Sequence, residues 1–277
     1  MSALLSPQDA LALVPFIDAG EVSVIELKGG LTNRAYQVGS GKDQFVLRLD
    51  AEHTRYFNLD RVSEIAILRS AASAGIAPEL VYSDTERGIL LCRYLPGKVW
   101  STGHLQDPGN FAALCDLLRR VHTLPLSGIR FDAAAVAKRY VGNLENRQGL
   151  HAFAMRCADV IASVPPSDVV AVCHNDVVAQ NVISTPGLRL LDWEYACDND
   201  PLFDLASLVG YHNLDEHRAQ ALLDANAGGA DAALRERLAG QVRVYDAIQW
   251  LWLANRHRLS PNGEQAARLE VLQQRIG

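Results

Sequence analysis

The sequence predicts an α+β protein in two lobes, a small β-rich N-terminal lobe (residues 1–95) and a larger, mainly helical C-terminal lobe (residues 96–277). Three observations predict this class. Short alternating or apolar runs separated by glycine-rich turns fill the first third of the chain. The tripeptide Leu95-Pro96-Gly97 then breaks the pattern and marks a hinge. Beyond it, apolar residues recur mainly at helical spacing. The sequence contains no recognisable repeat or interdomain linker.

The N-terminal lobe is expected to contain five strands and two helices. Ser6 is a candidate N-cap, and Pro7 suits the first turn of a short helix that we expect to end near Asp18. A second helix is predicted over residues 59–74, where Gly75 is a plausible stop. The predicted strands span residues 22–28, 35–38, 44–49, 79–83 and 88–94.

The C-terminal lobe is expected to be helical apart from one short strand–loop–strand unit at residues 174–192. Its predicted helices span residues 108–122, 132–161, 215–227, 230–258 and 263–276. Asp204 precedes an apolar run that also reads as helical. A cleft between the two lobes is the expected place for a site.

Composition describes an ordinary globular protein, with 49% hydrophobic and 21% charged residues among 277. The net charge of −6 argues against nucleic acid as the main partner. The five cysteines show no CxxC spacing and are expected to be buried apolar side chains. Since neither a secretory leader nor a membrane-spanning run is evident, we expect a cytoplasmic monomer or homodimer without membrane insertion.

The most informative stretch runs from His174 to Asp204 and places Asp176, Asn181 and Asp192 within one strand–loop–strand unit. Phosphoryl transfer needs a carboxylate to accept an alcohol proton, and it needs hard oxygen ligands for magnesium. We therefore predict Asp176 as the catalytic base and Asn181 and Asp192 as the metal ligands. Turns and helix caps use the same residue types, but the combination between apolar strands favours catalysis.

Three segments are candidates for binding ATP. The glycine turn at residues 29–33 lies between two predicted strands and suits contact with phosphates, although a plain hairpin turn is the alternative. Arg48, on an apolar strand, and Glu64, on the following helix, are a candidate phosphate-orienting pair. The hinge segment offers backbone groups to an adenine ring. The predicted ATP-binding residues are Gly30, Thr32, Asn33, Arg48, Glu64, Arg93 and Tyr94.

The acceptor is expected to contact acidic and aromatic residues. Glu194 follows Asp192 by two positions, so in an extended segment it points the same way and reaches a second metal or a cationic substrate. Tyr195 is also predicted to contact the acceptor. Trp250 shares a helix face with Asp246 and is predicted to bind a cation, whereas Trp252 points away from it. Core packing is the alternative for both tryptophans.

Other polar residues around this stretch are expected to be structural. His174, two residues before the predicted base, braces the loop backbone. Asp204 either caps a helix or braces the catalytic loop. Asp198 and Asp200 are expected in turns.

Taken in order, the motifs GGLTNR, FVLRL, a helical Glu, RYLPG, HNDVVAQN and LLDWEYA resemble those of the choline/ethanolamine kinase family, which includes bacterial choline kinases and thiamine kinase. This family is part of the aminoglycoside-phosphotransferase-like group with a protein-kinase-like fold. The resemblance runs from about Glu26 to Tyr211. It implies ATP and Mg²⁺ as cofactors, and it implies the same roles for Asp176, Asn181 and Asp192, and for the pair Arg48 and Glu64.

Two departures from the family pattern concern Asn175 and the tryptophans. Asn175 occupies the middle of the H-x-D loop, where the family usually has a small or apolar residue. Trp250 and Trp252 lie two apart, whereas choline kinases typically space their aromatic pair by three. The expected activity is ATP-dependent phosphorylation of a small, cationic alcohol, with choline or ethanolamine first. Thiamine or an aminoglycoside is the alternative acceptor, and a catalytically silent pseudokinase is the alternative of another class.

Overall fold

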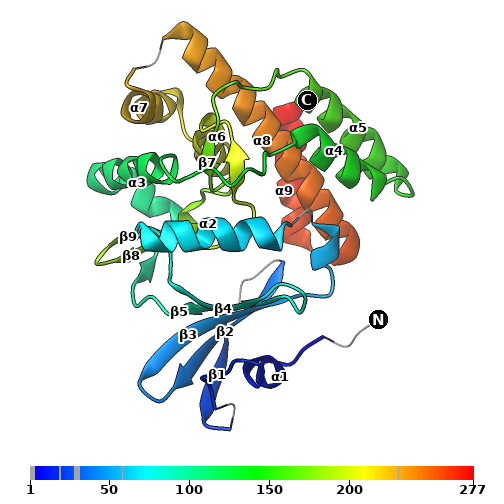
Figure 1. Cartoon of the computed structure of the whole chain (residues 1–277). Coiled ribbons are helices and arrows are strands. Elements are labelled where there is room, and N and C mark those ends of the chain that lie inside the picture. The colour runs from blue at the N-terminus through cyan, green and yellow to red at the C-terminus, as the bar shows by residue number, and fades with distance from the viewer. Residues whose placement is uncertain (1–3, 19, 28–31, 58, 230) are drawn as a thin grey trace.

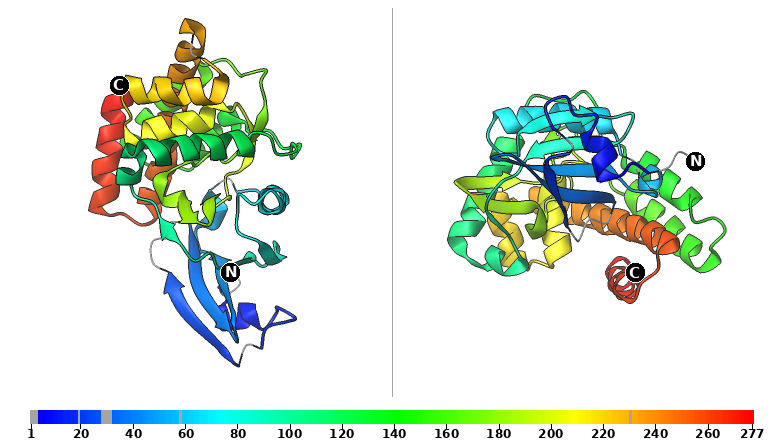
Figure 2. Two further views of the ribbon diagram at one scale, coloured as in Figure 1. Left: turned by 90° about the vertical axis from the view of Figure 1, so that its left-hand side faces the viewer. Right: turned by 90° about the horizontal axis from the view of Figure 1, so that it is seen from below.

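In the computed structural model, residues 4–18, 20–27, 32–57, 59–229 and 231–277 are described. Gly30, together with most of the predicted glycine turn, lies outside these residues. The ribbon separates into a β-rich part that carries the N-terminus and a helical part that carries the C-terminus (Figures 1 and 2). This arrangement confirms the α+β class with a small β-rich and a larger helical lobe. The division at residues 95 and 96 stays a prediction.

The N-terminal lobe is built on a five-stranded antiparallel sheet in the order β1-β2-β3-β5-β4. Its strands are β1 (Val22–Leu27), β2 (Asn33–Ser40), β3 (Asp43–Asp50), β4 (Leu80–Asp84) and β5 (Ile89–Arg93). Along β3, Phe45, Leu47 and Leu49 are buried. Burial at every second residue is the period of a strand with one covered face, which explains why this strand was predicted almost to the residue.

The helix α1 (Pro7–Leu11) packs beside the sheet and contributes Ala10 and Leu11 to its core. Ser6 caps it by accepting a hydrogen bond from the Asp9 amide. The prediction that it continues to Asp18 was wrong. Pro15 disfavours helical geometry at the residue before it, and the helix ends earlier.

The helix α2 (Arg61–Ser73) lies between the sheet and the helical lobe (Figure 1). Asp60 caps its N-terminus by accepting hydrogen bonds from the amides of Val62 and Ser63. Ile67, Leu68 and Ala71 are buried in a core that continues into the C-terminal lobe. Because α2 shares this core with Leu90 and Cys92 of β5 and with the C-terminal helices, side chains at its first turn are held at the boundary between the lobes.

The C-terminal lobe consists of packed helices, of which α8 buries Tyr245, Trp250 and Leu251 and runs through the middle. The helices are α3 (Pro108–Val121), α4 (Ala133–Gly142), α5 (Gln148–Ala162), α6 (Leu202–His212), α7 (Glu216–Ala227), α8 (Ala232–Leu259) and α9 (Gly263–Ile276). Residues 132–161 were predicted as one helix. The structure divides them after Gly142, where Asn143 forms the C-cap, because glycine weakens a helix.

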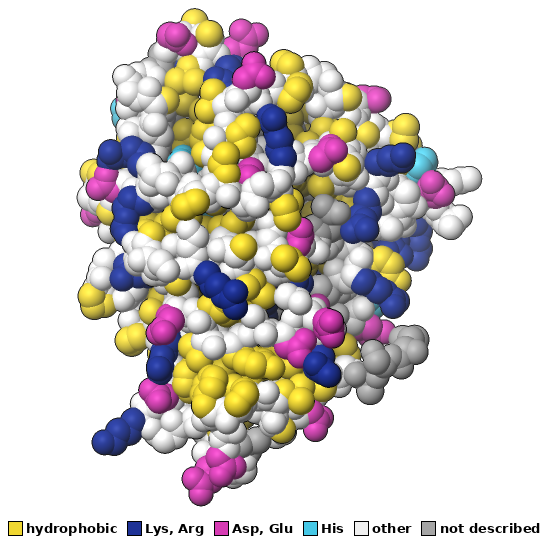
Figure 3. All heavy atoms as spheres, in the orientation of Figure 1, with side chains coloured by type: hydrophobic (Ala, Val, Ile, Leu, Met, Phe, Trp, Pro, Cys, Tyr) yellow, Lys and Arg dark blue, Asp and Glu magenta, His cyan; other side chains and the backbone are white. Residues whose placement is uncertain are grey.

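Two small sheets carry the loops of the central unit. One contains β6 (Lys98–Val99), β8 (Val182–Thr185) and β9 (Gly187–Leu190), and the other pairs β7 (Ala171–Cys173) with β10 (Cys197–Asn199). β8 and β9 lie within the predicted unit at residues 174–192, whereas β6, β7 and β10 were not predicted, because two or three residues are too few to show a period. On the face seen in Figure 3, acidic and basic side chains are interspersed, and hydrophobic side chains gather over the N-terminal lobe. Within the described residues, every helix is too short or too polar to cross a bilayer.

Candidate active site

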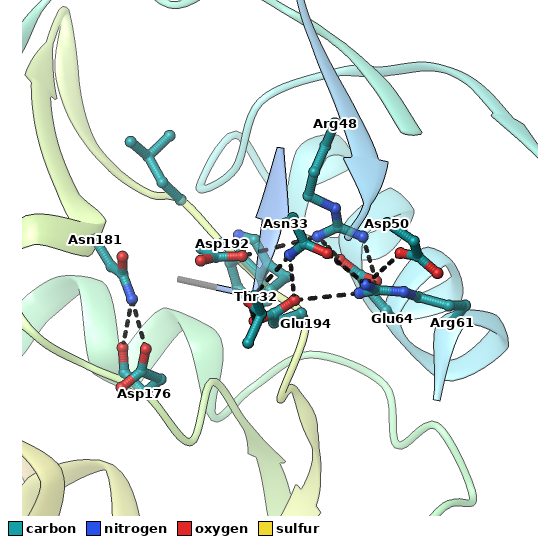
Figure 4. Close-up of polar contacts among 12 residues, drawn as sticks. Thr32, Asn33, Arg48, Asp50, Arg61, Glu64, Asp176, Asn181, Asp192 and Glu194 are labelled. Carbon is teal, nitrogen blue, oxygen red and sulfur yellow. Dashed lines mark hydrogen bonds and ion pairs between the residues drawn. The ribbon is translucent and has the colours of Figure 1, made fainter. Parts of the chain in front are cut away.

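Asp176 lies in the loop that follows β7, and Asn181 ends a single 3₁₀ turn, η3 (Ala179–Asn181), just before β8. The Asn181 Nδ2 donates to the Asp176 backbone oxygen at 2.9 Å and to its Oδ2 at 3.0 Å (Figure 4). The amide nitrogen of Asn181 therefore fixes the Asp176 carboxylate. Among the described residues nothing donates to the Asn181 Oδ1, which is the atom suited to a cation.

The hairpin of β8 and β9 brings Asp192 next to this pair. Val182 lies opposite Leu190, and the Leu191 amide donates to the Asn181 carbonyl at 2.8 Å. Asp192 therefore follows directly after the residue opposite Asn181. Its side chain is 43% exposed, and its Oδ1 lies 3.8 Å from the Arg48 NH1. Asp192 has a φ of 59°, a left-handed conformation that side chains other than glycine adopt rarely and often at functional sites.

Asp204, at the start of α6, braces the loop that carries Asp176. Its fully buried carboxylate accepts hydrogen bonds from the amides of His174 (3.1 Å) and Asn175 (2.7 Å). The His122 Nε2 lies 2.9 Å from the Asp204 Oδ2. The Nε2 of the buried His174 lies 2.8 Å from the Leu191 carbonyl, so it ties the same loop to the β9 end. Asp204 and His174 thus hold the backbone of the loop that carries Asp176.

The backbone conformation and contacts of Asn175 account for an asparagine at this position of the loop. Its φ is 63°, and asparagine tolerates this left-handed conformation better than most residues. Its Nδ2 donates to the Tyr195 carbonyl at 2.9 Å, and its Oδ1 accepts from the Asn199 Nδ2 at 2.8 Å. The side chain therefore joins the loop of Asp176 to the segment that follows Asp192.

The environment of Asp176 makes it a stronger base than an exposed aspartate. Burial raises the pKa of Asp176 from 3.8 to about 7, against the hydrogen bond from Asn181, and the negative charges of Glu194 and Asp204 raise the pKa further. A base with a pKa near neutrality holds a proton firmly and still ionises at physiological pH. This property suits proton transfer from an alcohol.

Arg48 and Glu64 form the ion pair that the sequence predicted. Both Arg48 NH groups contact the Glu64 carboxylate, the second at 2.7 Å, and the Glu64 side chain is only 1% exposed. Arg48 projects from β3, and Glu64 from the first turn of α2. The pair thus lies on the N-terminal lobe opposite Asp192 (Figure 4).

The Glu194 carboxylate was expected to reach a second metal or a cationic substrate, but both of its oxygens contact other side chains. Its Oε1 accepts a hydrogen bond from the Thr32 Oγ1 at 2.5 Å, and its Oε2 accepts one from the Asn33 Nδ2 at 2.6 Å. The side chain is 3% exposed. Because both oxygens are engaged by the N-terminal lobe, the expected role as an acceptor-binding carboxylate has no support in this geometry.

Arg61, which we did not predict as a site residue, lies at the centre of this network. Its NH1 contacts Glu64 (2.9 Å) and Glu194 (3.3 Å). Its NH2 contacts the Asn33 Oδ1 (2.8 Å) and Asp50 (2.6 Å). Burial and the nearby Arg48 charge oppose protonation, but the surrounding carboxylates raise the pKa of Arg61 above its usual value. The available sequence signal was its position three residues before Glu64 on one helix face.

Two predicted acceptor residues lie away from the site. Trp250 is fully buried in the C-terminal core, where its ring centroid is 4.7 Å from that of Phe153. Asp246 is buried and forms an ion pair with Arg275 at 2.7 Å. Trp250 is therefore a core residue, which is the alternative that the sequence left open. The Trp252 Nε1 donates to the Tyr195 hydroxyl at 2.8 Å, and its ring is 5.6 Å from that of Phe57.

The predicted hinge contacts also differ in detail. The Arg93 guanidinium, at the end of β5, pairs with Asp43, at the start of β3, at 2.6 Å. The amides of Arg93 and Tyr94 donate to the carbonyls of Glu79 (2.8 Å) and Gln44 (3.0 Å), so neither is free to donate to a ligand.

Asp198 and Asp200 hold neighbouring backbone rather than occupying simple turns. Asp198 belongs to β10 and accepts hydrogen bonds from the amides of Ser127 (2.9 Å) and Gly128 (2.8 Å). Asp200 accepts one from the Leu202 amide at 3.0 Å, at the start of α6.

Comparison with known proteins places this chain among phosphotransferases. The sequence model of the phosphotransferase enzyme family (APH) matches residues 23–240. Protein LicA of Haemophilus influenzae is 27% identical over 206 residues, which cover 71% of this chain and 60% of that protein. A thiamine kinase of Escherichia coli is 29% identical over 207 residues, covering 70% of this chain and 68% of that protein.

A solved choline/ethanolamine kinase family protein from Mesorhizobium loti has a TM-score of 0.74 and 26% identity, with coverage of 97% of this chain and 92% of that one. The likeness extends over both lobes and confirms the expected kinase-like fold class. Because the family's sequence model matches most of its length, the chain belongs to the phosphotransferase enzyme family.

Proposed function

We propose that this protein transfers the γ-phosphoryl group of ATP to the hydroxyl of a small alcohol. One observation carries the proposal. Asp176, Asn181 and Asp192 project from two adjoining loops of the C-terminal lobe, and Asp192 faces the Arg48–Glu64 pair of the N-terminal lobe. Such an arrangement brings together, between the two lobes, a base, oxygen ligands for a metal ion and a side-chain cation that can bind phosphate.

The residues present fit a magnesium ion. The Asn181 Nδ2 donates to Asp176, so the Asn181 Oδ1 stays available to a cation. The exposed Asp192 carboxylate contacts Arg48 only at 3.8 Å. Amide and carboxylate oxygens are ligands that magnesium accepts, usually together with substrate phosphates. When bound, the ion supplies charge neutralisation on the transferring group.

Asp176 orients the acceptor hydroxyl and takes its proton as the new P–O bond forms and the bond to the ADP oxygen breaks. Asn181 holds the Asp176 carboxylate in place through its Nδ2. Arg48, held by the buried Glu64, orients the α- and β-phosphates. Most of the rate enhancement then comes from positioning and electrostatics rather than covalent chemistry.

For the nucleotide, we propose that the segment around Thr32 and Asn33 covers the phosphates, and that the chain after Tyr94 contacts the adenine. The N-terminal lobe, which we place at residues 1–95, would thus carry most of the ATP contacts, and the rest of the chain the acceptor. We place the enzyme in the cytoplasm, where ATP is available.

The acceptor we favour is a cationic alcohol. Trp252, Tyr195 and Phe57 form an aromatic group joined by the 2.8 Å hydrogen bond and the 5.6 Å ring contact. Aromatic faces attract ammonium groups by about 0.5–2 kcal/mol. Choline or ethanolamine is the first candidate, and thiamine, which also carries a quaternary nitrogen and a primary hydroxyl, is the second. An aminoglycoside would need a wider acidic surface than these residues provide.

The test is an ADP-release screen over choline, ethanolamine, thiamine, aminoglycosides and neutral sugar alcohols, with phosphorus NMR of the product. We expect Mg²⁺-dependent turnover with one of the three cationic alcohols, and none with Asp176→Ala. Turnover confined to neutral sugars would contradict the acceptor assignment. Mg²⁺-dependent ATP binding without product across the panel would instead favour the catalytically silent pseudokinase.

A further inference from the structure

Arg61 contacts four separate segments with one guanidinium group. Asn33 begins β2, Asp50 ends β3, Glu64 lies on α2, and Glu194 belongs to the C-terminal lobe just after Asp192. Figure 4 shows the guanidinium among these groups. A planar fork with several donors can serve such a set, whereas a lysine ammonium cannot reach all four in the same geometry.

The charges around Arg61 make this contact consequential. Glu64 and Glu194 are 1% and 3% exposed, so both negative charges depend on nearby cations. Glu64 is shared by Arg48 and Arg61, whereas among the described residues Arg61 is the one cation within ion-pair distance of Glu194. Without Arg61, Glu194 would be a buried carboxylate with hydrogen bonds from the neutral Thr32 and Asn33 and only the more distant charge of Arg48 to balance its own. A buried charge that loses its partner is strongly unfavourable, so the surroundings must move.

We propose that Arg61 is a positioning residue for phosphoryl transfer that sets the distance between the two lobes at the site. This inference rests on the proposed function. Arg61 acts on both lobes. Through Glu64 it orients Arg48, and through Glu194 it fixes the segment directly after Asp192 and the start of β2.

Because Glu194 and the predicted metal ligand Asp192 are two residues apart, the contact also transmits the position of the N-terminal lobe to the metal site. Arg48 makes the matching contact from the same lobe to Asp192 at 3.8 Å. The phosphate-orienting side chain and the metal ligand are therefore kept in register by one network. Arg61 itself touches neither reacting atoms nor phosphate in this account.

The kinetic test compares Arg61→Gln and Arg61→Lys with Arg87→Gln. Arg87 is a matched control because it also lies on the N-terminal lobe and also pairs with an aspartate, Asp84, but is 54% exposed and contacts only its own lobe. We expect Arg61→Gln to lower kcat by about 100-fold, the effect of misplacing reacting groups by about 1 Å. Arg61→Lys should recover part of that loss, and Arg87→Gln should resemble the wild type.

A merely structural role for Arg61 would lower thermal stability but leave kcat per folded enzyme unchanged, and that result would overturn the proposal. So would equal losses in Arg61→Gln and Arg87→Gln. If Arg61→Gln does not fold, Arg61→Lys carries the test, because it retains the positive charge. An unaltered kcat in the folded lysine variant would then refute the need for the guanidinium geometry.

A second measurement separates this inference from the proposed function. Urea unfolding of Arg61→Gln, Glu194→Gln and the double variant gives the coupling between the two side chains without any turnover. We expect the double variant to be more stable than the sum of the single losses predicts. Wild-type protein without turnover but with this coupling would refute the proposed function alone. Additive losses would refute the link between the lobes.

Discussion

The brace formed by Asp204 gives the sharpest prediction, because one substitution removes a charge without changing volume. In Asp204→Asn, one carboxylate oxygen becomes an amide nitrogen, which cannot accept a hydrogen bond. If the nitrogen replaces Oδ2, the His174 amide, now 3.1 Å from an acceptor, faces a donor instead. If it replaces Oδ1, the Asn175 amide at 2.7 Å does. Either orientation leaves a buried backbone donor without a partner.

The size of the effect follows from these contacts. A hydrogen bond to a charged group contributes about 1.5–3 kcal/mol, and an unsatisfied buried donor costs about 1–3 kcal/mol more. We therefore expect Asp204→Asn to lower the free energy of unfolding by about 3–5 kcal/mol. For a chain of this size that corresponds to a Tm lowered by roughly 10 °C. The displaced loop carries Asp176, so kcat should also fall by about 100-fold.

Asp198→Asn is the matched control. The buried Asp198 carboxylate also accepts three hydrogen bonds, from the Ser127 amide, the Ser127 Oγ and the Gly128 amide, but these hold a different loop. Thermal unfolding should show similar Tm losses in both variants, whereas steady-state kinetics should show the loss of kcat in Asp204→Asn alone. Wild-type kcat in Asp204→Asn, or an equal loss in Asp198→Asn, would refute the bracing role.

Three further predictions follow from the site. Asp176→Asn should lack turnover yet be more stable than the wild type in metal-free buffer. Folding raises the pKa of the Asp176 carboxyl from 3.8 to about 7, so the wild type loses stability as the pH rises between these two values. The Tm gain should therefore be larger at about pH 8 than at about pH 5, and an equal gain at both would contradict the pKa assignment. Asn181→Ala and Asp192→Asn should raise the Mg²⁺ concentration needed for half-maximal activity; an unchanged requirement would remove them as ligands. Trp252→Ala should raise the acceptor KM. Trp250→Ala should instead lower the free energy of unfolding by about 3–5 kcal/mol and leave the acceptor KM unchanged. The reverse pattern would restore Trp250 as the acceptor residue.

The predictions that held came from patterns with a strong local cause. Apolar residues at every second position predicted β3. The helical spacing predicted α9 at its observed bounds and α3 with an end one residue later than observed. The pairing of Arg48 with Glu64 was also predicted, because a cation on an apolar strand and a carboxylate beside the apolar stripe of the next helix both point inward.

The failures came from contacts between distant residues. Glu194 was expected to face a substrate, but its partners Thr32 and Asn33 lie more than 160 positions away, and only the folded arrangement of the lobes brings them together. The choice between Trp250 and Trp252 depended on the rotation of α8 against the core, which a 28-residue helix with apolar side chains on several faces does not reveal.

The central claim is that Asn181 and Asp192 hold a single metal–nucleotide complex next to Asp176. A crystal structure with Mg²⁺, a non-hydrolysable ATP analogue and the best acceptor tests it most directly. We predict one Mg²⁺ bound by the Asn181 Oδ1 and the Asp192 carboxylate at about 2.1 Å, with the acceptor hydroxyl within hydrogen-bond distance of Asp176. A metal bound elsewhere, or an acceptor hydroxyl directed away from Asp176, would contradict the account.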